Sequence, residues 1–164
     1  MSLVNTALMR CAPVLLATFP IVYLLAENRT EGIQAYQTAL PLLALWLGVA
    51  LLQVLAYLVL RDHGKSAAVA ALFVLAFYGY GLLIEHNDQS VFGVTLFRGR
   101  FLVPAVAGFL VAGISVIVRI RINWYSLLRW VSLTSLALIA INTARIPLAR
   151  EDVLVVVDLP REFA

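Results

Sequence analysis

Few side chains of this 164-residue sequence could do chemistry, and the most promising pair is Glu85 beside His86. A carboxylate next to an imidazole could act as an acid–base pair, or both groups could hold the polar head of a lipid. The other histidine, His63, lies on the far side of the uncharged run 67–84, which is long enough to span a membrane. A haem held between two histidines is therefore not expected, because the two would lie on opposite faces of the bilayer.

Other charged and polar residues border apolar runs in the same way. Arginine can pair with phosphate through two hydrogen bonds, so residues of this kind could contact a lipid headgroup or a partner protein. The candidate contacts are Glu27, Asn28, Arg29, Glu85, His86, Arg98 and Arg100. Ordinary interfacial charge and helix capping would explain the same residues, and this alternative stays open.

No catalytic, cofactor-binding or metal-binding residues are expected from sequence motifs. The sequence has no glycine-rich phosphate loop, no GxSxG motif and no metal-ligand spacing. It has one cysteine, Cys11, so an internal disulfide framework is excluded.

The composition indicates the environment that must position these residues. Hydrophobic residues make up 63% of the chain and charged residues 13%, against roughly 45–50% and about 25% in soluble domains. The net charge of +3 comes from Lys and Arg residues placed between apolar runs. This pattern sets the orientation of membrane proteins, so we expect membrane lipids and other membrane proteins as partners, and no nucleic acid.

Five runs without Asp, Glu, Lys or Arg predict an all-α polytopic membrane protein with five transmembrane helices, since a crossing needs about 20 residues. The runs are 11–26, 39–60, 67–84, 101–118 and 127–144. Pro13, Pro41 and Pro104 fall in the first turns of their runs, and Pro147 should end the fifth. Pro20 lies within the first run and predicts a kink there.

Residues 1–146 are expected to form the transmembrane domain and residues 147–164 an extracytoplasmic tail. The basic residues fall equally on the two sides of the predicted spans. Arg150 and Arg161 lie in the tail, away from the membrane, so they are left out of this comparison. The side that holds the amino terminus then carries more basic residues, which places it in the cytoplasm. The first run is expected to stay as an anchor because no basic residue precedes Arg10.

Two further features lead to expectations about packing. The β-branched run 153–157, bounded by acidic residues, predicts one strand that pairs with a partner or opens a further domain; an unpaired apolar tail is the alternative. Gln53, inside the second run, should hydrogen-bond another helix. The small-residue pairs Ala67/Ala71 and Gly108/Ala112 should mark close helix contacts.

The order of short motifs resembles the five-helix membrane module at the amino terminus of bacterial sulfatase-like hydrolases and transferases, of the alkaline phosphatase superfamily. These motifs are YLLAEN (23–28), LPL (40–42), LRD (60–62), FYGY (77–80) and RFLVP (100–104). The resemblance implies a bacterial cytoplasmic membrane as the location. It also implies that 153–157 opens an extracytoplasmic catalytic domain, with Asp158 matching a metal ligand. The nucleophile and remaining ligands of the family would lie beyond Ala164, so the chain itself is not expected to be an enzyme.

The leading functional hypothesis is a non-catalytic membrane module that anchors and positions a partner or an ectodomain and contacts its lipid substrate. The alternative is an accessory transmembrane subunit of a large respiratory, photosynthetic or secretory complex. A small transporter is disfavoured, because none of the predicted spans contains a charged residue.

Overall fold

The computed structural model describes residues 3–28, 35–85, 99–120 and 122–157. All regular structure in these residues is helical. The helices are α1 (Leu3–Glu27), α2 (Ala35–Leu60), α3 (His63–Glu85), α4 (Gly99–Arg119) and α5 (Trp124–Val157). Each contains a segment long and apolar enough to cross a membrane, which confirms five helices of membrane-spanning length and composition.

The predicted strand at 153–157 is not shown, because α5 runs through these residues to Val157 and also passes Pro147. A single strand leaves its backbone hydrogen bonds unmade unless another strand pairs with it, and the described residues contain no strand. A helix satisfies those groups within one segment. Extending an existing helix also avoids the cost of starting a new one. The expected stop at Pro147 is wrong, because α5 continues past this residue.

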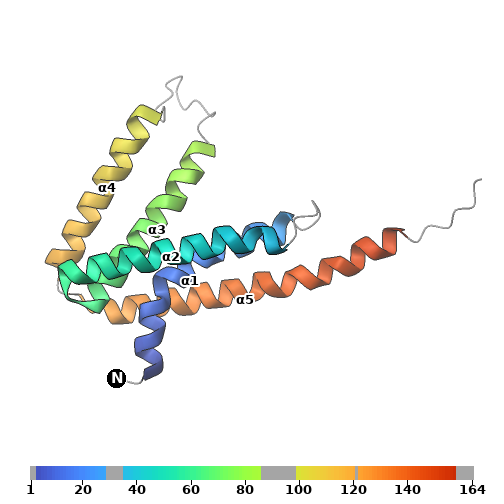
Figure 1. Ribbon diagram of the computed structural model, residues 1–164, viewed down its shortest axis with the longest axis horizontal. Helices are drawn as coiled ribbons and strands as arrows, with labels where there is room; N and C mark the ends of the chain where they lie inside the picture. The colour runs from blue at the N-terminus through green and yellow to red at the C-terminus, as the bar shows by residue number, and fades with distance from the viewer. Residues whose placement is uncertain (1–2, 29–34, 86–98, 121, 158–164) are drawn as a thin grey trace, which may run out of the picture.

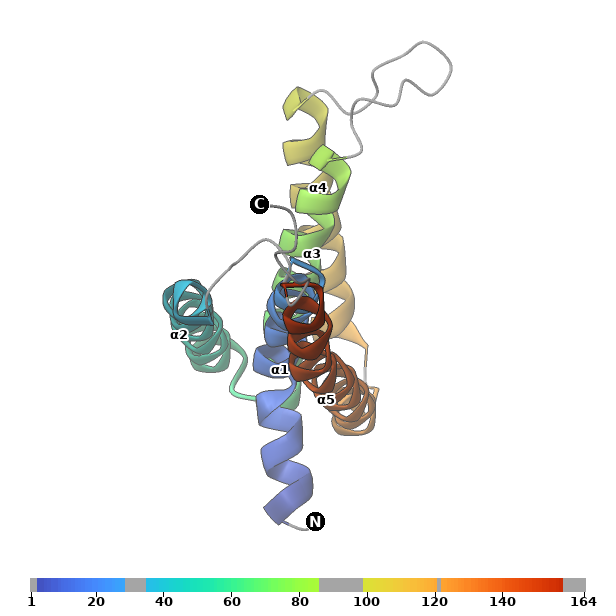
Figure 2. The same cartoon turned by 90° about the vertical axis from the view of Figure 1, so that its right-hand side faces the viewer.

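The helices pack around α1 and α3, as Figures 1 and 2 show. The most extensive pairing joins α1 and α5, and α3 touches each of the other four helices. In Figure 1 the hairpin of α3 and α4 leans away from α1, α2 and α5. In Figure 2 α2 stands at the side of the bundle.

Small side chains dominate the contact between these helices. The main core cluster consists of Met9, Ala12, Ala67, Ala68, Val69, Ala71, Ile117 and Leu128. Ala67 and Ala71 are both buried, which confirms the close contact predicted for that pair. Gly108 and Ala112 are exposed, so the second predicted pair is wrong. The close approach occurs one residue later, at Gly113, where an added Cβ would lie 2.6 Å from Leu72 Cδ2.

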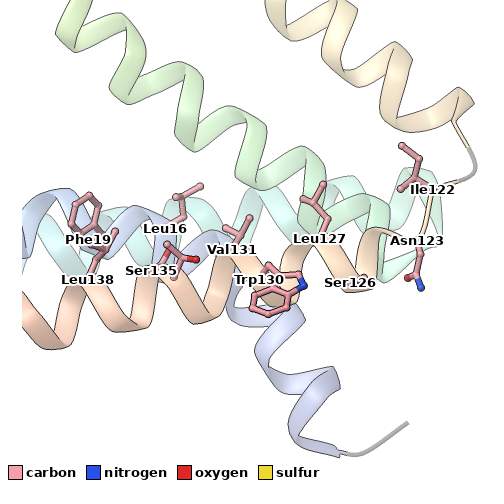
Figure 3. A pocket seen from close by; sticks show the side chains of 11 residues that line it. Leu16, Phe19, Ile122, Asn123, Ser126, Leu127, Trp130, Val131, Ser135 and Leu138 are labelled. Atoms are coloured by element: carbon pink, nitrogen blue, oxygen red, sulfur yellow. The ribbon is translucent and has the colours of Figure 1, made fainter.

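Helix α1 bends before Leu16, whereas the kink was expected at Pro20. Figure 3 shows Leu16 and Phe19 on the part of α1 that lies beyond the bend and alongside α5, so the bend precedes Leu16 and is closer to Pro13 than to Pro20. The sequence pattern placed Pro13 in a first turn, whereas α1 begins at Leu3 and contains both prolines. A proline inside a helix removes one backbone hydrogen bond and clashes with the preceding turn, which accounts for a bend near Pro13.

Candidate functional site

The candidate contact residues that the structure describes fall into two separate places. Glu27 ends α1 and pairs with Arg145 of α5 at 3.3 Å, with both side chains about half exposed. Asn28 follows Glu27 and is half-buried. This pair therefore joins α1 to α5 where both helices reach the predicted outer surface.

The second place is the far end of the α3–α4 hairpin. Glu85 is the last residue of α3, and Arg100 lies in the first turn of α4. Figure 1 shows the end of α3 beside the start of α4 and away from the end of α1. The described helices thus do not gather the candidates into one pocket. Arg29, His86, Arg98 and Asp158 lie outside the described residues, and their roles stay predictions.

Metal binding finds no support within the part of the chain that the structure describes, which has no group of three or more His, Cys, Asp or Glu side chains able to hold an ion. His63 begins α3, at the end opposite Glu85, and its ring stacks on Tyr57 with 4.2 Å between centroids and 7° between planes. The imidazole is therefore packed against a neighbouring helix end.

Polar side chains inside the spans join α1 to three other helices. The Trp46 Nε1–H of α2 donates to Thr18 Oγ1 at 2.9 Å, and the Thr18 hydroxyl donates to Val14 O at 2.7 Å. The Tyr78 hydroxyl of α3 donates to Ala17 O at 2.7 Å. The Ser132 hydroxyl of α5 donates to Leu8 O at 2.6 Å. In hydrocarbon these bonds satisfy polar groups and fix the helices relative to α1.

Trp46 and Tyr78 were not predicted to be hydrogen-bond donors between helices. Both lie inside apolar runs of the sequence, Trp46 in 39–60 and Tyr78 in 67–84. Aromatic residues with one polar atom usually find a partner for that atom when buried, and this property was the signal that could have identified both.

Gln53 was expected to hydrogen-bond another helix, and this prediction is wrong for the described residues. Its side chain lies half-buried on α2 and makes no hydrogen bond within that part of the chain. By contrast, Ser115 and Asn142 bond backbone oxygens one turn earlier in their own helices, Val111 O at 2.7 Å and Leu138 O at 2.8 Å. Gln53 is thus an amide within an apolar span that these residues leave unpaired.

At the opposite end of the bundle the α2–α3 and α4–α5 connections pack together. Asp62 Oδ1 accepts hydrogen bonds from the backbone N–H groups of Gly64 and Lys65, at 2.8 and 3.1 Å, and so caps α3. Lys65 Nζ donates to Val118 O at 2.8 Å near the end of α4. A Cβ at Gly64 would lie 3.3 Å from Trp124 Cβ, so glycine allows the close approach of α3 to α5.

The turn before Asp62 requires an unusual backbone. Arg61 has φ 51° and its N–H donates to Tyr57 O at 2.8 Å, which ends α2. This left-handed conformation usually belongs to glycine or asparagine. It allows α2 and α3 to follow one another with only two residues between them.

A groove of about 780 Å³ runs between α1 and α5 (Figure 3). Leu16 and Phe19 of α1 line it together with Leu127, Trp130 and Leu138 of α5. None of the candidate contact residues lines this groove. Its walls are mostly apolar, with Asn123, Ser126, Thr134 and Ser135 as the polar lining residues, and they suit a hydrocarbon chain.

These helices define the class: the chain fits a multi-pass membrane protein with five apolar helices of membrane-spanning length. No protein-family model, curated protein or solved structure matches the chain. The function is therefore inferred from the site residues and the fold alone.

Proposed function

We propose that the chain is a non-catalytic membrane module that anchors a partner or an extracytoplasmic domain and holds it in a fixed position. The observation that carries this proposal is the length of α5. Its apolar segment covers Trp124–Ile146, whereas the helix continues without a break to Val157. A continuous helix is stiffer than a loop, so it transmits the position of the bundle to whatever follows.

Two contacts fix α5 to the rest of the bundle. Near its start, buried Ser132 bonds the backbone of α1 at Leu8. Near the end of its apolar segment, Arg145 pairs with Glu27 at the end of α1. An anchor needs this kind of attachment at two depths, because one contact alone would leave the helix free to tilt.

The proposal includes the location and orientation expected from the sequence. We place the chain in the bacterial cytoplasmic membrane, with the amino terminus in the cytoplasm and the carboxyl end outside. The resemblance to the membrane module of sulfatase-like enzymes supports this choice, as does the basic character of the Arg61–Lys65 and Arg119 end of the bundle. In this orientation Glu27 and Asn28 face the outer lipid headgroups, where the lipid substrate of an attached domain would lie.

The alternative function is an accessory subunit of a large membrane complex. The exposure of α2 and α4 favours it, because only 6% and 11% of their spans are buried within the chain. Lipid can cover such faces, and so can the helices of other subunits.

One measurement separates these functions: the intact mass and composition of the natural protein purified from its membrane in mild detergent. A chain heavier than 18.0 kDa, carrying a Ser or Thr nucleophile and Asp/His ligands after Ala164, supports the anchor of a catalytic domain. A chain of 18.0 kDa in stoichiometric complex with other membrane proteins supports the subunit. A chain that purifies alone and drives solute uptake in proteoliposomes contradicts both.

Orientation is tested by cysteine labelling in intact cells, in a Cys11→Ser background. A membrane-impermeant maleimide should label Asn28→Cys and leave Arg61→Cys unlabelled until the membrane is opened. The reverse pattern would contradict the proposed orientation without affecting the five-helix topology.

A further inference from the structure

The unpaired amide of Gln53 lies within the apolar segment Thr38–Leu60 of α2, seven residues before its end. Its side chain is half-buried, and neither amide atom is fully enclosed by the described residues. A primary amide has two donors and an acceptor with two lone pairs. In hydrocarbon, where no water is present, an amide without a partner costs several kcal/mol in transfer measurements. A second helix that supplies both a donor and an acceptor at this depth would remove that cost.

Gln53 belongs to a stripe of residues along α2 with the spacing of a coiled-coil seam. This stripe, called the Gln53 stripe below, consists of Leu43, Trp46, Ala50, Gln53 and Tyr57. The intervals alternate between three and four residues, as in the a and d positions of a heptad. Leu43 is 58% exposed, Trp46 43% and Tyr57 37%. The stripe therefore lies open to the surroundings of the protein.

The members of the Gln53 stripe are already ordered within the chain. Trp46 is held by its hydrogen bond to Thr18, and Tyr57 by stacking on His63. Ala50, beside Gln53, is small and exposed, which lets a second backbone come close. Figure 2 shows α2 at the side of the bundle, where a further helix has access to it.

We propose that the Gln53 stripe is a homodimer interface, in which α2 packs against α2 of a second copy of this chain and the two Gln53 amides hydrogen-bond each other. All copies of a membrane protein insert in the same orientation, so the two α2 helices are parallel and their Gln53 residues lie at the same depth. A twofold axis along the membrane normal brings identical residues together. The amide is self-complementary, whereas an unrelated partner would need its own polar group at that depth.

The inference requires that α2 crosses a membrane but does not depend on the anchoring role. It adds a second function to the bundle, because a dimer would present two carboxyl ends side by side. A dimer and an anchored domain are compatible, and each is tested separately.

The first experiment measures dimerisation of the full chain in liposomes, from energy transfer between donor-labelled and acceptor-labelled copies as the protein-to-lipid ratio is varied. Gln53→Leu should weaken dimerisation about tenfold, since two interhelical hydrogen bonds are lost. Gln53→Asn keeps an amide and should retain more of the affinity than Gln53→Leu. Ser115→Ala is the matched control, because that hydroxyl is exposed on α4 and bonds its own helix, and it should dimerise like the original chain.

The second experiment locates the interface by cross-linking in native membranes, in a Cys11→Ser background. Ala50→Cys lies on the Gln53 stripe, whereas Ala44→Cys lies on the opposite side of α2 from Gln53; both alanines are exposed. A short thiol cross-linker should join copies through Ala50→Cys and not through Ala44→Cys.

The proposal is overturned if the original chain is monomeric in liposomes, if Gln53→Leu dimerises as strongly as the original chain, or if both cysteine variants cross-link equally. A chain that fails to enter the liposomes at all would instead contradict the membrane topology, and the two failures are distinguished by flotation of the liposomes.

Discussion

The hydrogen bond from Ser132 to Leu8 O gives the sharpest test of how α5 is attached to α1. Ser132 is completely buried, and its Oγ lies 2.6 Å from the carbonyl oxygen across the helix interface. Ser132→Ala removes this bond and almost no volume. Leu8 lies within α1, so its carbonyl oxygen can still accept the hydrogen bond of its own helix.

The expected loss of stability in Ser132→Ala follows from the burial and length of this hydrogen bond. Interhelical hydrogen bonds in membrane proteins contribute about 0.6 kcal/mol on average and up to about 1.7 kcal/mol. The Ser132 bond is short and fully enclosed, and its loss leaves no orphaned acceptor, so we expect about 1 kcal/mol. This value corresponds to about a fivefold change in the unfolding equilibrium constant.

The assay is unfolding in mixed micelles, titrated with a denaturing detergent and followed by the fluorescence of Trp46, Trp124 and Trp130. Ser115→Ala is the control, because its hydroxyl bonds Val111 O of the same helix and is exposed; its effect should stay within about 0.5 kcal/mol. Equal midpoints for Ser132→Ala and Ser115→Ala would refute the claim that the Ser132 bond holds α5 to α1.

The same unfolding assay tests three further contacts. Tyr78→Phe removes the hydroxyl that donates to Ala17 O and should destabilise the bundle by about 0.6 kcal/mol; an unchanged midpoint would contradict the bond. Asp62→Ala removes the cap of α3 and should cost about 1 kcal/mol, with most of the loss recovered in Asp62→Asn; equal losses in both variants would count against capping. Glu27→Gln breaks an ion pair that is about half exposed, so the change should stay below about 0.5 kcal/mol and vanish at high salt; a larger loss that persists in salt would mean that the pair is shielded from solvent.

The number of helices and their approximate positions could be predicted from the sequence, because hydrocarbon imposes a strict requirement on each span. Every backbone group must bond within its own segment, and side chains must be apolar. This requirement is local, so it appears in each run of uncharged residues, for example 39–60, which became α2. The buried pair Ala67 and Ala71 was predictable for a similar reason, since small residues at this spacing allow close packing.

The predictions that were not confirmed concern features that depend on more than one segment. Residues 153–157 have a composition typical of strands, but a strand needs a partner, and the described residues provide none. The bend in α1 lies closer to Pro13 than to Pro20, because the helix begins earlier than the apolar run suggested and so contains Pro13. Gly113, rather than Gly108, meets Leu72 because the rotation of α4 against α3 is set by the whole bundle.

For the candidate contact residues, too, one feature could be predicted from the sequence and another could not. Their position at the ends of spans followed from the sequence, as Glu27, Glu85 and Arg100 show. Their separation into an α1 end and an α3–α4 end did not, because it results from the lean of the hairpin seen in Figure 1.

The sequence by itself determined the solvent of this protein and the number of its helices, because burial in hydrocarbon acts on each segment separately. Only the tertiary structure decided which polar groups find partners. Trp46, Tyr78 and Ser132 reach acceptors on α1, whereas Gln53 reaches none in the described residues. Hydrogen bonds between helices depend on the rotation and depth of two segments at once, and no single segment encodes both.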